Sequence, residues 1–97
     1  MAIKIRWSPG SAADLEDICH FISKDSDYYA RMFAQKIIDI VERIPSFPES
    51  GRIVPEYQRQ DLREKIYKNY RIVYRIKDDA IEITAITHSA KPLLDSL

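Results

Sequence analysis

The apolar residues of this chain change their spacing near the middle, and this change restricts the fold more than any other feature. Between residues 9 and 44 they recur every three or four positions, as in Ala30, Phe33 and Ile37, which is typical of helices that bury one face. After residue 61 they alternate with polar residues, which is typical of half-buried strands. A helical half followed by a stranded half predicts an α+β fold.

Two helices are expected in the first half. The first spans residues 9–23, because Ser8 and Pro9 supply an N-cap and a first-turn proline. The second spans residues 27–44, with the polar run at residues 25–27 as its cap. Only a few residues join the two helices, which predicts an antiparallel helix hairpin.

Four strands are expected around these helices. The chain begins with an N-terminal strand in which Ile3, Ile5 and Trp7 alternate with basic residues. Residues 62–67, 70–76 and 81–88 predict a three-stranded antiparallel meander, because the breaks between them are polar and short. Residues 46–61 show no clear period and are expected to form a loop. The whole chain, residues 1–97, is therefore expected to be a single two-layer α+β domain.

Basic residues are concentrated in the same part of the chain as the meander. Residues 51–77 hold eight Lys or Arg and three acids, a net charge of +5, whereas residues 1–50 and 78–97 carry −2 and −3. On the middle strand, Tyr70, Ile72, Tyr74 and Ile76 point to one face, and Arg71, Val73, Arg75 and Lys77 to the other. We expect the helices to cover the first set and to leave an open basic face, which predicts an anionic partner.

Composition excludes several function classes. There is no apolar run near 18 residues and no signal-peptide pattern at the start, so neither a membrane span nor secretion is expected. The single cysteine, Cys19, is typical of a cytoplasmic protein. Two histidines without paired spacing predict no metal site, and two glycines are too few for a phosphate-binding loop. No cofactor is therefore expected.

Short motifs recur along nearly the whole chain in a specific order. They are Trp7-Ser-Pro, Ala13-Asp-Leu-Glu-Asp-Ile, Phe47-Pro-Glu-Ser-Gly-Arg, Val54-Pro-Glu, Leu62-Arg-Glu, Tyr70-Arg-Ile-Val-Tyr and Thr87-His-Ser-Ala-Lys. In these motifs the chain resembles the RelE/ParE superfamily of toxins from bacterial and archaeal toxin–antitoxin systems. The resemblance implies a small cytoplasmic toxin that is held inactive in a hetero-oligomer with its antitoxin.

The superfamily resemblance leaves two activities open. RelE-like members cleave mRNA in the ribosomal A site, whereas ParE-like members poison DNA gyrase. The motifs are more similar to the ParE-type, plasmid-stabilisation branch, which implies a growth inhibitor that binds gyrase and performs no chemistry. That branch usually ends its last strand with His-x-x-Arg, and here Lys91 replaces the Arg, which keeps the charge and loses the bidentate fork. A third alternative is a binding module that has kept the fold and lost its toxicity.

Three residues are candidate catalytic groups if the chain is a ribonuclease. Metal-free RNA cleavage needs a base, an acid and a cation that stabilises the phosphorane. The resemblance to ribonucleolytic relatives implies Glu56, Arg71 and His88 for these roles. Each has a structural alternative: Glu56 as a solvated loop acid, Arg71 as a partner of Glu82 across the sheet, and His88 as a hydrogen-bonding residue at the sheet edge.

The remaining candidates concern binding. The residues expected to contact the target or the antitoxin are Arg63, Lys65, Arg71, Arg75 and Lys91. Three tyrosines, Tyr67, Tyr70 and Tyr74, are suited either to stacking on bases or to core packing. Arg52 is expected to be structural and to anchor the loop to an acid of the helix hairpin.

Overall fold

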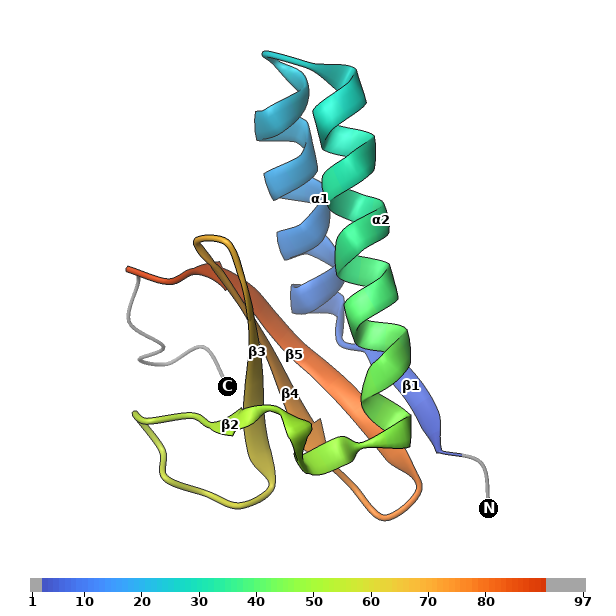
Figure 1. Cartoon of the computed structure of the whole chain (residues 1–97), viewed down its shortest axis with the longest axis vertical. Helices are drawn as coiled ribbons and strands as arrows, with labels where there is room; N and C mark the ends of the chain where they lie inside the picture. Colours follow the sequence, from blue (N-terminus) through green and yellow to red (C-terminus); the bar gives the residue numbers. More distant parts are fainter. Residues whose placement is uncertain (1–2, 91–97) are drawn as a thin grey trace.

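The computed structural model describes residues 3–90 and confirms the α+β fold (Figure 1). The elements in chain order are β1 Lys4–Trp7, α1 Pro9–Ser23, α2 Asp27–Arg43, β2 Arg52–Ile53, β3 Leu62–Tyr67, β4 Tyr70–Ile76 and β5 Ala80–His88. Two short 3-10 turns, η1 Ile44–Ser46 and η2 Pro48–Ser50, lead from α2 to β2. No helix within residues 3–90 combines the length and the apolar character that a membrane crossing requires.

Local capping explains where the two helices begin. The Ser8 hydroxyl accepts a hydrogen bond from the Ser11 backbone N–H, and the Ser26 hydroxyl accepts one from that of Tyr29. Each cap satisfies one of the N–H groups that have no partner within a helix. α1 has the predicted bounds, whereas α2 ends at Arg43, one residue earlier than predicted, because the chain tightens there into η1.

The strands form one five-stranded sheet in the order β1-β5-β4-β3-β2. The predicted meander is confirmed, since β3, β4 and β5 pair antiparallel in sequence order. Two features were not predicted. β1 joins the sheet by parallel pairing with β5, in the register Trp7↔Ile83, and the stretch expected to be a loop contributes the two-residue strand β2.

The main core lies between the sheet and the helix hairpin, which Figure 1 shows as two long helices that extend beyond one end of the sheet. α2 contributes Phe33, Ile37 and Val41 to this core. Ile72 and Tyr74 of β4 pack against them, with Tyr70 and Ile76 partly buried beside them. The prediction that this set of β4 residues faces the helices is therefore confirmed.

The opposite face of the sheet was predicted to be open, and that prediction is wrong. A second, smaller core lies on it, formed by Val54, Leu62, Val73 and Ala85 with Tyr57 packed beside them. Val54 and Tyr57 belong to residues 54–60, the segment between β2 and β3, which we call the strap. The strap covers this face because its two apolar side chains can be buried only against the sheet.

Candidate functional site

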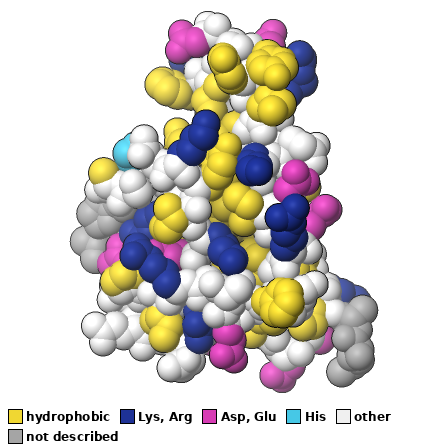
Figure 2. Space-filling model, in the orientation of Figure 1, with side chains coloured by type: hydrophobic (Ala, Val, Ile, Leu, Met, Phe, Trp, Pro, Cys, Tyr) yellow, Lys and Arg dark blue, Asp and Glu magenta, His cyan; other side chains and the backbone are white. Residues whose placement is uncertain are grey.

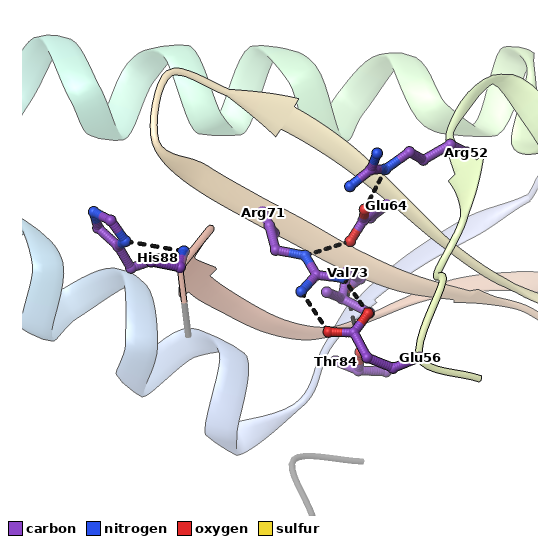
Figure 3. A network of polar contacts seen from close by, with 8 residues as sticks. Arg52, Glu56, Glu64, Arg71, Val73, Thr84 and His88 are labelled. Carbon is purple, nitrogen blue, oxygen red and sulfur yellow. Dashed lines mark hydrogen bonds and ion pairs between the residues drawn. The ribbon is translucent and has the colours of Figure 1, made fainter. Parts of the chain in front are cut away.

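Arg71 was predicted to project into solvent, but it lies beneath the strap with only 5% of its surface exposed. Its Nη1 and Nη2 atoms donate to the two carboxylate oxygens of Glu56, each at 2.7 Å, and its Nε donates to Glu64 at 2.6 Å (Figure 3). The hydrogen bond with Glu56 raises the pKa of Arg71 above its ordinary value. Each guanidinium nitrogen of Arg71 thus donates to an acid within the molecule, and Arg71 does not pair with Glu82, which lies next to Lys77 instead.

Glu64 lies at the centre of this network, although no motif or spacing pointed to this role. Its side chain is 0% exposed and accepts hydrogen bonds from both Arg71 and Arg52 (Figure 3). Arg52 therefore does anchor the segment after the helices, as expected, but to an acid of β3 rather than of the helix hairpin. A buried carboxylate of this kind is tolerated only with such partners.

Arg63 has a structural role on the helix-facing side of the sheet. Its guanidinium donates to the backbone oxygens of Glu49, Gly51 and Gln60, and it is only 9% exposed. Tyr74, on the same face, donates its hydroxyl to Pro48 O at 2.6 Å and accepts from Gly51 N–H at 3.0 Å. Residues 48–51 and Gln60, the last residue of the strap, are therefore fixed by side chains of the helix-facing side. The first part of the strap, Val54 to Tyr57, lies against the other face.

His88 does not lie beside Arg71. It is opposite Tyr70 in the β4–β5 register, and the two rings pack edge to face with their centroids 5.6 Å apart. Tyr70 packs on Phe33 of α2, so His88 is on the helix side of the sheet. Figure 3 shows its ring turned away from Arg71, with Nδ1 accepting from the Ala90 N–H at 3.2 Å. The sheet thus separates the two groups that were predicted to share a catalytic site.

The tyrosines and the other predicted binding residues have different positions. Tyr67 and Tyr70 pack against Phe33, and Tyr74 is fully buried, which favours the core-packing alternative for all three. Arg75 is half-buried, and its Nε is a buried donor without a hydrogen-bond partner. Lys65 lies beside α2, as described below. Lys91 is outside the described residues.

A groove runs between α2 and β3, and the sequence analysis missed it. Two hollows lie along it, one lined by Tyr29, Met32, Phe33, Tyr67 and Lys68 among others, and one by Ile40, Arg43, Phe47, Lys65 and Ile66 with Ser50. Figure 2 shows apolar side chains on this face with Lys and Arg on both sides. We call this surface the α2–β3 groove.

Large apolar side chains in this groove are unusually exposed. Phe47 is 72% exposed, Tyr29 66% and Met32 53%. Contiguous exposed apolar side chains rimmed by charge are typical of a protein-binding surface. The spacing of Tyr29, Met32 and Ile40 on α2 could have revealed this second apolar stripe beside the buried one.

Possible metal ligands do not cluster in the part of the chain that the structure describes. Within residues 3–90 no three His, Cys, Asp or Glu side chains are grouped so that they could hold a metal ion. The acids nearest to each other in the network, Glu56 and Glu64, already accept hydrogen bonds from arginines. The site is suited to ion pairing and to macromolecular binding.

Solved structures of two toxin–antitoxin systems share the fold of this chain. No curated protein matches the chain by sequence. Among solved structures, the chromosomal ParDE toxin–antitoxin system from P. aeruginosa matches with a TM-score of 0.73 and 21% identity, over 89% of this chain and 95% of that one. The RelBE2 toxin–antitoxin complex from Mycobacterium tuberculosis matches with a TM-score of 0.67 and 14% identity, over 91% and 99%. At these identities the two structures show a shared fold.

The family assignment comes from the sequence itself. Residues 5–93 match the family model for the ParE toxin of the type II toxin–antitoxin system parDE. The match begins in β1 and runs past the end of β5, so it includes the helix hairpin, the strap and the whole ion-pair network. The chain therefore belongs to the ParE toxin family, within the RelE/ParE superfamily of type II toxins.

Proposed function

We propose that this toxin arrests growth by binding DNA gyrase and that it does not cleave RNA. The observation that carries the proposal is the separation of Arg71 and His88 by the sheet. A metal-free ribonuclease needs its base, acid and cation within hydrogen-bond reach of a single phosphate. Side chains on opposite faces of one sheet cannot meet this condition.

The ion pair between Arg71 and Glu56 supports the same conclusion. A cation that is to stabilise a phosphorane must have donors directed at the phosphate. Each of the three guanidinium nitrogens of Arg71 donates to a carboxylate instead. Glu56 is held by the same contacts, and so it is poorly placed to act as a base.

Purified toxin tests the choice of target directly. We expect it to inhibit DNA supercoiling by gyrase and to leave mRNA intact on translating ribosomes. His88→Ala should retain gyrase inhibition fully. His88 lies outside the ion-pair network, and it contacts the core through the ring of Tyr70. Cleavage of mRNA that disappears in the His88→Ala variant would refute the proposal and establish the ribonuclease.

We also propose that an antitoxin covers the α2–β3 groove. Both solved structures described above are toxin–antitoxin complexes. The floor of the groove is apolar and its rim carries Arg43, Lys65 and Lys68. Such a surface matches an amphipathic segment with acidic flanks. Residues 29–43 of α2 span about 20 Å at 1.5 Å per residue, which accommodates a helix of roughly four turns.

Phe47 is the side chain with which to test the antitoxin site. Because it is 72% exposed, its truncation should change the free energy of unfolding by less than about 0.5 kcal/mol. Burial by a partner would be worth about 1.5–3 kcal/mol for a side chain of this size, so Phe47→Ala should weaken antitoxin binding roughly tenfold or more.

Phe21 provides a matched control. It is 66% exposed but lies on α1, outside the groove. Isothermal titration of the antitoxin should therefore give an unchanged Kd for Phe21→Ala. Equal losses of affinity in the two variants would mean that the groove is not the antitoxin site.

A further inference from the structure

The strap is held over the sheet by a carboxylate that occupies an arginine fork. Glu56 of the strap accepts hydrogen bonds from both terminal nitrogens of Arg71, and Glu64 of β3 accepts one from Nε. The Glu64 side chain is completely buried, whereas that of Glu56 is 27% exposed. If Glu56 left, Glu64 would still orient the fork towards the face that the strap covers. The fork is therefore a preformed site for a carboxylate.

The strap also fills an apolar floor beside the fork. Val54 is fully buried against Leu62, Val73 and Ala85, and Tyr57 packs against the same cluster. The N–H groups of Tyr57 and Gln58 both donate to Val54 O, at 3.2 and 2.9 Å, and so close a tight turn. A Val-Pro-Glu-Tyr turn thus places one apolar, one acidic and one aromatic side chain on complementary parts of the sheet.

The two parts of the segment between α2 and β3 are held to the sheet by different contacts. Residues 48–51 are fixed to the helix side by Tyr74 and Arg63. The backbone at Gly51 also lies directly against Tyr74, since a Cβ atom there would meet Tyr74 Oη at 2.6 Å. Residues 54–57 of the strap, by contrast, are held to the outer face by Glu56, by the packing of Val54 and Tyr57, and by a backbone hydrogen bond from Val54 N–H to Leu62 O. The end of the strap stays in place through Gln60, which accepts from Arg63.

We propose that the strap is a built-in occupant of a peptide-binding site on the outer face of the sheet. A protein partner would displace it with a turn of similar chemistry, in which an apolar residue and an aromatic residue flank an acidic one. The acid would take the place of Glu56 on Arg71. The apolar floor favours such a segment over a bare phosphate, which would leave Leu62, Val73 and Ala85 exposed to water. The inference is independent of whether gyrase is the target.

The covalent attachment of the strap to the rest of the chain explains why it, and not a partner, occupies the site. A segment attached through a short loop acts on its own site at an effective concentration of roughly millimolar. A free peptide of residues 54–58 should therefore compete poorly with the strap of the unmodified toxin. Removing the Glu56 carboxylate from the strap should strengthen the binding of this free peptide at least tenfold.

The test uses the full chain with Glu56→Ala, and with Glu56→Gln as the variant that keeps the side-chain shape. Peptide 54–58 is titrated by NMR, with the Arg71 Nε–H signal as the probe of the fork. We expect at least tenfold tighter binding to the variants than to the unmodified toxin, together with faster hydrogen exchange at Val54 and Gln58. The same peptide with Gln in place of its Glu should not bind.

Glu49→Ala is the control, because Glu49 is an exposed acid on the segment that is fixed to the other face. It should leave both peptide affinity and strap exchange unchanged. Three results would each overturn the inference: equal peptide affinity for all variants, unchanged exchange of the strap in both Glu56 variants, or binding of inorganic phosphate as tight as that of the peptide.

Discussion

Replacing Glu64 by Gln should cost far more stability than replacing its exposed partner Arg52 by Ala. Glu64 is a fully buried carboxylate that accepts from Arg52 and Arg71, whose side chains are 60% and 6% exposed. Removing one member of a buried ion pair costs about 3–5 kcal/mol, because the other charge is left without a partner in a poorly solvated place. Glu56 still neutralises Arg71 in this variant, so we expect a loss near the lower end, about 3 kcal/mol.

The Arg52→Ala variant should lose much less. Its guanidinium is mostly in water, and exposed ion pairs contribute about 0.2–1 kcal/mol. Glu64 keeps its hydrogen bond from Arg71 when Arg52 is removed, so no buried charge is left alone. The two substitutions at one ion pair should therefore differ by about 2 kcal/mol or more.

Urea unfolding followed by the fluorescence of Trp7 and by circular dichroism measures both losses. A loss of 3 kcal/mol in a domain of this size lowers Tm by roughly 12–24 °C. The m-value should stay constant, since neither change alters the surface exposed on unfolding. If Glu64→Gln lost no more than Arg52→Ala, the buried carboxylate would not be what holds the network together.

Three other outcomes follow from the packing. Gly51→Ala should lose about 1–3 kcal/mol of stability in the same unfolding assay, because the new Cβ would lie 2.6 Å from Tyr74 Oη and 2.7 Å from Glu64 O. Gly10→Ala is the control and should be neutral or slightly stabilising, since the nearest atom to its Cβ is 4.0 Å away. Equal losses of stability in the two variants would contradict the steric reason. Arg71→Ala should destabilise the fold by about 3 kcal/mol or more, since it leaves the buried carboxylate of Glu64 with only the mostly exposed Arg52 as a partner. Burial raises the pKa of the Cys19 thiol, so iodoacetamide should alkylate it more slowly at pH 7 than a free cysteine, and unfolding in urea should abolish the difference.

The sequence was informative wherever a local pattern decides the structure. The bounds of α1, β3 and β4 were predicted correctly, because caps, alternation and two-residue breaks act over a few positions. β2 was missed, since two residues are too few to show a period. The parallel pairing of β1 with β5 was missed as well, because residues 4–7 carry no local sign of a partner more than seventy positions away.

The candidate site shows the same limit more sharply. Alternation placed Arg71 correctly on the face away from the helices, but it could not show that the strap lies on that face. Glu64 was counted only as one of three acids in a basic segment, whereas it pairs with two of the arginines in that segment. Three of the eight basic residues in that segment, Arg52, Arg59 and Arg71, are thus paired with its three acids. Lys65 and Lys68, by contrast, line the α2–β3 groove.

The pairing of β1 with β5 has a consequence for how the chain is made. Residues 4–7 leave the ribosome long before their partners at residues 80–83, which are among the last of the described residues to emerge. β5 also separates β1 from the rest of the sheet, so no earlier strand can take its place. Contacts of such long sequence separation form late and slowly. A nascent chain of this toxin therefore cannot complete its sheet until residues 80–83 have left the ribosome.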